Sequence, residues 1–274
     1  MTTTLITGIP RSGTTFVCAC LNTLPNCVAL AEPMSVPQHG DIDRAVDEIC
    51  RFAEATRSRL LAEGMGPSMT VNEVITDNFF EDAKADGGVR LGLTRMADVK
   101  IDKPLTMDFR LFIKHPAIFT VLAQHLLGRL PLYAIVRHPL AAVASWQTVD
   151  TAVRNGRLPV AEAFAPELRE TLDRILDPLH RQVALVRWIF QLYRSLPRGC
   201  VLTYESIVRD PGAALRPLSG SAMPLVYPVR SFDPRTRYPG VDLASLARAL
   251  LAIEADVEPF YPDFAASLRP HLGA

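Results

Sequence analysis

The sequence carries no excess of charge of either sign. Its 274 residues include 29 Lys and Arg and 29 Asp and Glu, so the formal net charge is zero with histidine neutral. Surfaces that bind nucleic acids or anionic membranes are strongly basic. The balance therefore argues against a nucleic-acid partner or a broad membrane-binding face, although it leaves room for a local basic pocket.

Long apolar runs are also missing. No uncharged apolar segment reaches the roughly 18–20 residues that a membrane-spanning helix requires. The N-terminus passes from "MTTT" directly into a strand-like segment, without the basic and apolar regions of a secretory signal peptide. We therefore expect a cytoplasmic protein with no integral membrane segment.

Cysteine is scarce and follows no metal-binding pattern. The five cysteines are odd in number, and no two have the C-x-x-C spacing typical of zinc and redox sites. Four of them lie in apolar segments, which predicts reduced thiols that are mostly buried.

Hydrophobic residues, in contrast, are abundant. They make up 49% of the chain, enough for a sizeable core, and the length suits a single α/β domain over residues 1–274. The first segments are a strand "TLITGI", a helix "TTFVCACLNTL" that stops before Pro25, and a strand "CVALAEP" that ends at Glu32. A strand, a glycine-containing turn, a helix and a second strand are typical of parallel βαβ units.

The rest of the chain continues this alternation. Strands are predicted at 110–114, 131–137 and 199–207, and helices at 41–62, 117–128, 139–149, 160–176, 179–196 and from 242 onward. We predict an α/β three-layer sandwich with a central, mainly parallel sheet and a helical insertion after the second strand. Residues 35–108 are interpreted as this insertion on the acceptor side of the site, with a possible strand at "MADVKID", and residues 222–241 as a loop.

The segment "GIPRSGTT" resembles a phosphate-binding loop that lacks its lysine. Gly8 and Gly13 have the spacing of G-x-x-x-x-G-K-[ST], but Thr14 stands where the lysine would be, and Arg11 supplies a cation inside the loop. The backbone N–H groups of residues 12–15 and the threonine hydroxyls would converge at a helix N-terminus, where anions are favoured. The loop therefore predicts an anion site.

Two further strand ends are basic. The strand "LFIKHP" ends in Lys114, and "LYAIVRHP" ends in Arg137. A nucleoside triphosphatase usually places an acidic residue at such a strand end to hold Mg²⁺. The expected ligand is therefore an anion that side chains bind directly, without a metal ion.

Taken together, "GIPRSGTTF" and "IVRHPLAAVAS" resemble the paired signatures of sulfotransferases that use 3′-phosphoadenosine-5′-phosphosulfate (PAPS). The resemblance implies a P-loop-like loop that grips the 5′-phosphosulfate, and a 3′-phosphate held by Arg137 and Ser145, eight residues apart. "VLTYESIVRDP" resembles a third family element near the nucleotide, and "FIKHP" resembles a lysine-containing strand end of several branches. The resemblance covers roughly residues 3–34, 110–149 and 187–211.

The resemblance also assigns residues to the nucleotide. The implied nucleotide-binding residues are Pro10, Arg11, Ser12, Gly13, Thr14, Thr15, Phe16, Arg137, Ser145 and Tyr204. For Phe16 and Tyr204, contact with the nucleotide and ordinary core packing are both open.

Sulfuryl transfer needs cations and a base. Arg11 and Lys114 are expected to stabilise the charge that develops on the sulfuryl and leaving phosphate oxygens. Glu32 is expected to accept the proton of the acceptor hydroxyl, since a glutamate at this distance after the loop acts as base in the protein-tyrosine branch of the family. His115 is the alternative. The small-molecule branch uses a histidine near this strand end, although its motif is Lys-Thr-His and this chain has Lys-His-Pro.

The expected reaction transfers a sulfuryl group from PAPS to a hydroxyl of a small-molecule, sugar or lipid acceptor and leaves adenosine 3′,5′-bisphosphate. A metal-dependent P-loop kinase that acts on a small molecule and a catalytically inactive nucleotide-binding module are the alternatives. Neither the acceptor nor the oligomeric state can be inferred from the sequence.

Overall fold

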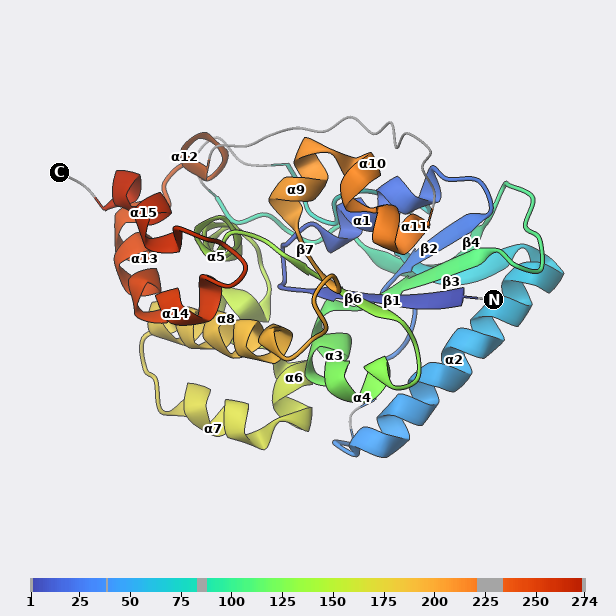
Figure 1. Cartoon of the computed structure of the whole chain (residues 1–274), viewed down its shortest axis with the longest axis horizontal. Helices are drawn as coiled ribbons and strands as arrows, with labels where there is room; N and C mark the ends of the chain where they lie inside the picture. Colours follow the sequence, from blue (N-terminus) through green and yellow to red (C-terminus); the bar gives the residue numbers. More distant parts are fainter. Residues whose placement is uncertain (1, 38, 83–87, 221–233, 273–274) are drawn as a thin grey trace.

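A five-stranded parallel sheet forms the centre of the protein, in a computed structural model that describes residues 2–37, 39–82, 88–220 and 234–272. The strands lie in the order β2-β5-β1-β6-β7, and every neighbouring pair is parallel (Figure 1). Their bounds are β1 (Thr2–Gly8), β2 (Cys27–Ala31), β5 (Arg110–Lys114), β6 (Leu132–Val136) and β7 (Val201–Thr203). The predicted α/β class with a mainly parallel sheet is confirmed.

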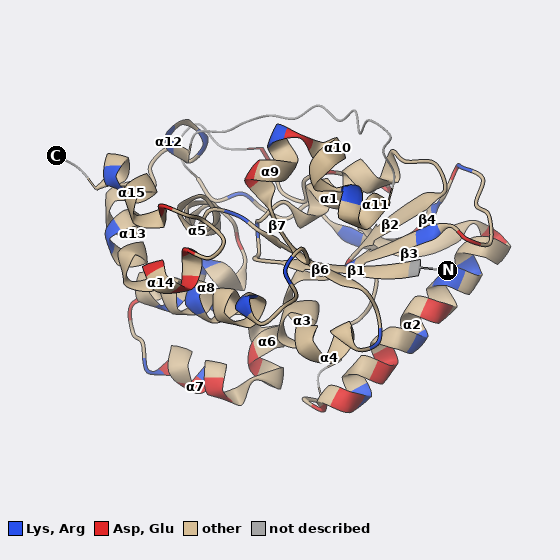
Figure 2. Ribbon diagram, viewed as in Figure 1, with Lys and Arg blue, Asp and Glu red and all other residues tan. Residues whose placement is uncertain are grey.

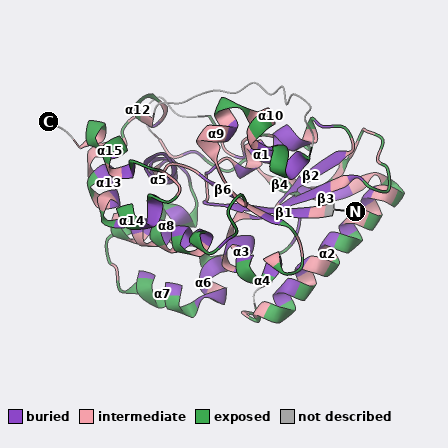
Figure 3. Ribbon diagram, viewed as in Figure 1, coloured by how far each residue is buried: buried purple, intermediate pink, exposed green. Residues whose placement is uncertain are grey.

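The central strands are apolar on both faces. In β1, Leu5 belongs to a large hydrophobic core and Ile6 to a smaller one. In β5, Leu111 and Ile113 pack in the larger core and Phe112 in the smaller. Successive strand residues point to opposite faces, so these apolar runs suit a sheet that is covered on both sides. Figure 3 shows the buried strands between helices whose outer surfaces are exposed.

Helices cover both faces and complete the three layers (Figure 1). The smaller core involves α1 (Thr14–Asn22), α9 (Tyr204–Arg209), α10 (Pro211–Ala214) and α11 (Arg216–Ser219). The larger core involves α2 (Ile42–Glu63), α3 (Pro116–Val121), α4 (Ala123–Leu127), α5 (Pro139–Gln147), α6 (Pro159–Phe164), α7 (Pro166–Asp173), α8 (Pro178–Arg194), α13 (Leu243–Leu250), α14 (Glu254–Val257) and α15 (Phe264–Leu268). The short α12 (Pro234–Arg237) and the 3-10 helices η1 (Ala152–Asn155), η2 (Leu251–Ile253) and η3 (Arg269–His271) complete the elements described. The predicted three-layer sandwich is confirmed.

Two predicted helices are each divided into two. The helix predicted at 160–176 is interrupted at Ala165, which has φ −129° and ψ 81° because the following residue, Pro166, disfavours the helical conformation before it. The helix predicted at 117–128 is interrupted at Leu122. There Thr120 Oγ1 donates to Pro116 O at 2.6 Å, a bond back to the preceding turn that bends helices.

The insertion consists of a long helix and a small sheet. α2 buries Val46 and Ile49 in the larger core, and its exposed face carries both acidic and basic residues (Figure 2). Asp41 caps its N-terminus by accepting from Arg44 N at 3.0 Å. The antiparallel pair β3 (Met65–Thr70) and β4 (Arg95–Lys100) follows, so the strand expected within "MADVKID" is confirmed.

The cysteine thiols are reduced, as the sequence predicts. All five cysteines are free; Cys18, Cys20 and Cys27 are buried, while Cys50 and Cys200 are partly exposed. Burial raises the pKa of Cys18 and of Cys20 to about 12, so both stay protonated at neutral pH.

Of the helices described, none combines the length and the apolar character that crossing a membrane requires.

Candidate functional site

The carboxyl ends of the parallel strands bring most of the predicted site residues to one edge of the sheet. Arg11 follows β1, Glu32 follows β2, Lys114 ends β5, Arg137 follows β6 and Tyr204 follows β7. Open parallel sheets bind ligands in the crevice outside this edge. Residues that are far apart in the sequence are thus neighbours because the strands run in the same direction.

The turn between β1 and α1 requires glycine at two positions. A Cβ added to Gly8 would lie 2.4 Å from Ile135 O, and one added to Gly13 would lie 2.4 Å from the Tyr204 ring. Gly13 also has φ 86°, a conformation that side chains rarely adopt. As the N-cap residue of α1, Gly13 has no side chain that could accept from the first-turn N–H groups of the helix.

A cavity of about 400 Å³ lies beside this turn. The predicted residues that line it are Arg11, Gly13, Thr14, Thr15, Phe16, Arg137 and Tyr204. Pro10, Ser12 and Ser145 are not among the lining residues but adjoin them. Pro10 O accepts from Trp146 Nε1 at 2.7 Å, and the Ser12 hydroxyl is buried without a hydrogen-bond partner in the described part of the chain.

Arg11 links the turn to helix α5 and to the insertion. Its Nε donates to Ser145 Oγ at 3.3 Å, and its Nη2 donates to Asn78 Oδ1 at 3.4 Å. The guanidinium also lies 4.4 Å from the centre of the Phe80 ring. Burial, together with the positive charge of Arg90, lowers the pKa of Arg11 to about 10, so the side chain is still charged at neutral pH.

Arg137 joins the second predicted segment to the first. Its Nη1 donates to Arg11 O and to Tyr238 OH, both at 3.3 Å, and its guanidinium lies 5.0 Å from the centre of the Tyr204 ring. Burial alone would lower the pKa of Arg137, but the phenol groups of Tyr238 and Tyr204 raise it. Arg137 and Ser145 do not bond to each other; both are held close to Arg11.

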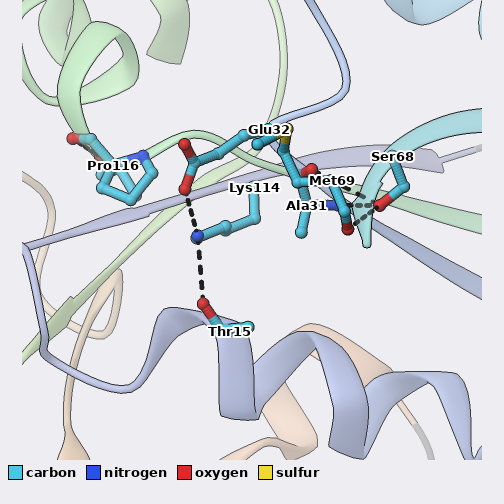
Figure 4. Close-up of polar contacts among 8 residues, drawn as sticks. Thr15, Ala31, Glu32, Ser68, Met69, Lys114 and Pro116 are labelled. Atoms are coloured by element: carbon cyan, nitrogen blue, oxygen red, sulfur yellow. Dashed lines mark hydrogen bonds and ion pairs between the residues drawn. The ribbon is translucent and has the colours of Figure 1, made fainter. Parts of the chain in front are cut away.

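Lys114 is the last residue of β5, which lies between β2 and β1 in the sheet. Its Nζ donates to Glu32 Oε1 at 2.5 Å and to Thr15 Oγ1 at 3.2 Å (Figure 4). It also lies 5.0 Å from the centre of the Phe79 ring. Thr15 lines the cavity, so the Glu32–Lys114 pair adjoins it through this hydroxyl.

Glu32 is held in an unusual conformation beside this pair. It has φ 48°, and its backbone N–H donates to Lys114 O at 2.6 Å. Burial alone would raise the pKa of Glu32, but the charges of Lys114 and His115 and the hydrogen bond from Lys114 outweigh it. The pKa is therefore below its ordinary value, and the carboxylate is ionised at neutral pH.

His115, the alternative base, has a different environment. It is 5% exposed, and its ring packs against Phe119 with 5.7 Å between ring centres. Burial lowers its pKa to about 4, and its Nδ1 has no hydrogen-bond partner among the described residues. Neither Glu32, Lys114 nor His115 is among the lining residues, but Lys114 bonds to the lining residue Thr15 and so brings the Glu32 carboxylate next to the cavity.

The two aromatic residues for which two roles were open have contacts of both kinds. Phe16 and Tyr204 pack edge to face, with ring centres 6.1 Å apart, and both pack against the smaller core. Both also line the cavity. One part of each ring is therefore held by the core while another part remains available to a ligand.

Sequence reasoning missed six lining residues: Asp77, Asn78, Asp82, Arg90, Arg237 and Tyr238. The first four belong to the insertion, which was expected to cover the site but contains no recognisable motif. The last two follow residues 221–233, so most of the loop predicted at 222–241 lies outside the described residues. The residues beside Arg90 give no local signal of a buried charge, since Leu91 is itself exposed.

No group of three or more His, Cys, Asp and Glu side chains suited to a metal ion occurs among the residues described. Comparison with models of known protein families finds no match, and comparison with curated proteins finds none either. The geometry of the site is therefore the basis for a proposal about function.

Proposed function

We propose that the protein is a sulfotransferase that moves a sulfuryl group from PAPS to a hydroxyl of a small-molecule, sugar or lipid acceptor. The observation that carries this proposal is the convergence of Arg11, Arg137 and Lys114 on the α1 N-terminus at one edge of the sheet. These groups favour a ligand with more than one anionic group.

The charge balance of the cavity supports an anionic ligand. Within the described residues, the guanidinium groups of Arg11, Arg90 and Arg137 bond to neutral oxygens and form no ion pair with a carboxylate. Buried charges without a partner are costly, and an anion would remove this cost. The Ser12 hydroxyl in the turn, which has no hydrogen-bond partner among the described residues, adds a further polar group for such a ligand.

The arrangement offers two places for anionic groups. The turn, the α1 N-terminus and Lys114 suit the 5′-phosphosulfate, while Arg137 and Ser145 suit the 3′-phosphate. Arg11 contacts Ser145 and carries the carbonyl that Arg137 binds, so it lies between the two places. The exposed parts of Phe16 and Tyr204 suit contact with adenine.

The proposed chemistry follows from these positions. Glu32 accepts the proton of the acceptor hydroxyl while the hydroxyl oxygen forms a bond to sulfur. The bond between sulfur and the 5′-phosphate oxygen breaks, and the electron pair remains on that oxygen. Arg11, Lys114 and the N–H groups of the turn stabilise the negative charge on the sulfuryl and phosphate oxygens. Glu32 suits the role of base better than His115 because its carboxylate is partly exposed beside the cavity, whereas the His115 ring is buried.

A metal-dependent kinase that acts on a small molecule is the second candidate. Asp77 and Asp82 line the cavity, and carboxylates of this kind bind Mg²⁺ in phosphoryl-transfer enzymes.

One assay separates the two candidates. The purified protein is incubated with PAPS labelled with ³⁵S and a panel of hydroxyl acceptors, and in parallel with ATP labelled at the γ-phosphate, each with and without excess chelator. The sulfotransferase proposal predicts ³⁵S transfer that persists in chelator. Transfer from ATP alone, lost in chelator and restored by Mg²⁺, would establish the kinase. Calorimetric binding of adenosine 3′,5′-bisphosphate without transfer would indicate the catalytically inactive module.

A further inference from the structure

The insertion contributes a buried arginine to the cavity. Arg90 is 2% exposed, yet it is one of the lining residues. Its Nη2 donates to Thr148 Oγ1 at 2.8 Å and lies 3.5 Å from Ser145 Oγ, and its Nε donates to Thr148 O at 3.4 Å. Ser145 is also the residue that Arg11 contacts, so two guanidinium groups meet at one hydroxyl.

Backbone hydrogen bonds hold Arg90 in this position. Its N–H donates to Thr148 O at 2.9 Å, and its carbonyl accepts from Asp150 N at 3.2 Å. These bonds form a parallel bridge between Arg90 and Val149, just beyond the end of α5. The guanidinium is therefore fixed against α5 before any ligand binds, which lowers the entropy cost of using it for binding.

The guanidinium of Arg90 forms no ion pair with any described side chain. Its partners are two hydroxyls and a carbonyl, and its Nη1 has no hydrogen bond within the described residues. Its charge contributes to the lowered pKa of the Arg11 guanidinium. If Arg90 served only to hydrogen-bond Thr148, a neutral donor would be sufficient. A second buried cation beside Arg11 instead raises the energy of the protein unless an anion binds there.

We infer that Arg90 is a specificity-determining residue that binds the 3′-phosphate of the nucleotide together with Arg137 and Ser145. This inference rests on the proposed function and adds a residue of the insertion to that site. A nucleotide without a 3′-phosphate leaves Arg90 without a directly bonded anion among the described residues, since the Asp82 carboxylate acts on its charge without forming an ion pair. The site therefore discriminates against 5′-monophosphates through a buried group left unpaired, a stronger device than added attraction alone.

The test compares two nucleotides on three proteins. Calorimetry measures the Kd of adenosine 3′,5′-bisphosphate and of adenosine 5′-monophosphate for the wild type, for Arg90→Met and for the control Arg95→Met. Arg95 belongs to the same insertion, but it is exposed and pairs with Glu73. Arg90→Met is expected to reduce the preference for the bisphosphate by about tenfold to a hundredfold, the range for one lost charge-assisted hydrogen bond, with the monophosphate Kd within about threefold. Arg95→Met should retain the wild-type preference.

The outcomes distinguish the inference from the function on which it rests. If the wild type prefers the bisphosphate and Arg90→Met keeps that preference, or if Arg90→Met weakens both nucleotides equally, Arg90 has only a structural role and the inference is wrong. If the wild type shows no preference, the proposed function is wrong as well. If Arg90→Met does not fold, as thermal unfolding would reveal, Arg90→Gln replaces it, since its amide can still donate to Thr148, and the same two results decide.

Discussion

Lys114 and Glu32 are joined across the ends of two neighbouring strands, with 2.5 Å between Nζ and Oε1. The lysine side chain is 3% exposed and the glutamate side chain 34%. The ammonium group is thus fixed within the wall of the site, whereas the carboxylate keeps an open side. An incoming hydroxyl can reach the carboxylate without breaking the strand pairing that holds both residues.

Replacing Glu32 by glutamine should remove the base while keeping the size of the side chain. A general base contributes about 10²–10⁴-fold to the rate, so kcat should fall by this factor while the Kd of adenosine 3′,5′-bisphosphate changes little. Steady-state kinetics and calorimetry measure the two quantities. Glu63→Gln, at an exposed position of α2, is the control. Near-normal turnover in Glu32→Gln together with collapse in His115→Asn would instead assign the proton transfer to His115.

The acidic side of the pH profile should lack a step near pH 6.5. Lys114 keeps the pKa of Glu32 below its ordinary value, and burial lowers the pKa of His115 to about 4. Because the carboxylate stays ionised above its lowered pKa, kcat should remain nearly constant as the pH falls from 7 toward about 5. Even with His115 as the base, its lowered pKa would give no step near pH 6.5. The Glu32→Gln and His115→Asn variants are therefore needed to identify the base. A step near pH 6.5 would contradict the lowered pKa of Glu32 and the lowered pKa of His115.

Tyr238 should make nucleotide binding weaker in alkaline solution. Burial alone would raise the pKa of its phenol, but Arg137 and a hydrogen bond with Ser145 lower it below the ordinary value. A phosphate bound to the same arginine would raise this pKa again, so the complex holds the phenol proton more tightly than the free protein. By linkage, affinity falls as the pH rises through the pKa of the free phenol.

Calorimetry between pH 7 and 10 measures this dependence. Tyr238→Phe should remove it, while Tyr133→Phe, whose hydroxyl donates to Pro217 O at the surface, should keep it. An identical alkaline loss in all three proteins would show that Tyr238 is not its source.

Gly8→Ala should destabilise the protein. The added Cβ would lie 2.4 Å from Ile135 O, a backbone atom of the neighbouring strand that cannot move alone. Overpacking of this kind costs about 1–3 kcal/mol in the free energy of unfolding. Gly92→Ala is the matched control, since no atom lies within 4 Å of the methyl group that it would gain, and its effect should stay within about 0.5 kcal/mol. Equal urea midpoints for both variants would mean that the β1 turn is less tightly packed than this contact implies.

The strands and their ends could be predicted because the local pattern was sufficient. Continuous apolar runs identified β1, β5 and β6, and parallel pairing then required Arg11, Lys114 and Arg137 to share one edge. Lys114, one of the predicted strand-end cations, also lowers the pKa of Glu32 together with its neighbour His115.

Arg90 and Tyr238 could not be predicted because their positions depend on long-range contacts. Arg90 reaches the site through a single backbone bridge to Val149, which leaves no periodic pattern in the insertion. Tyr238 follows Arg137 by 101 residues in the sequence, and its hydrogen bond with Arg137 becomes apparent only in the folded structure. The divided helices were missed for a different reason: a break at Ala165 depends on one following proline within an otherwise helical pattern.

The middle position of β1 also affects how the protein folds. β1 spans Thr2–Gly8 but pairs with strands that begin at Arg110 and Leu132. A short N-terminal fragment therefore does not contain a complete crevice. Closing such long loops is slow, and the pocket can form only when nearly the whole chain has assembled. A tight ligand therefore acts on the complete fold: at a free concentration of 100 times its Kd it would add about 2.7 kcal/mol to the stability of the native state.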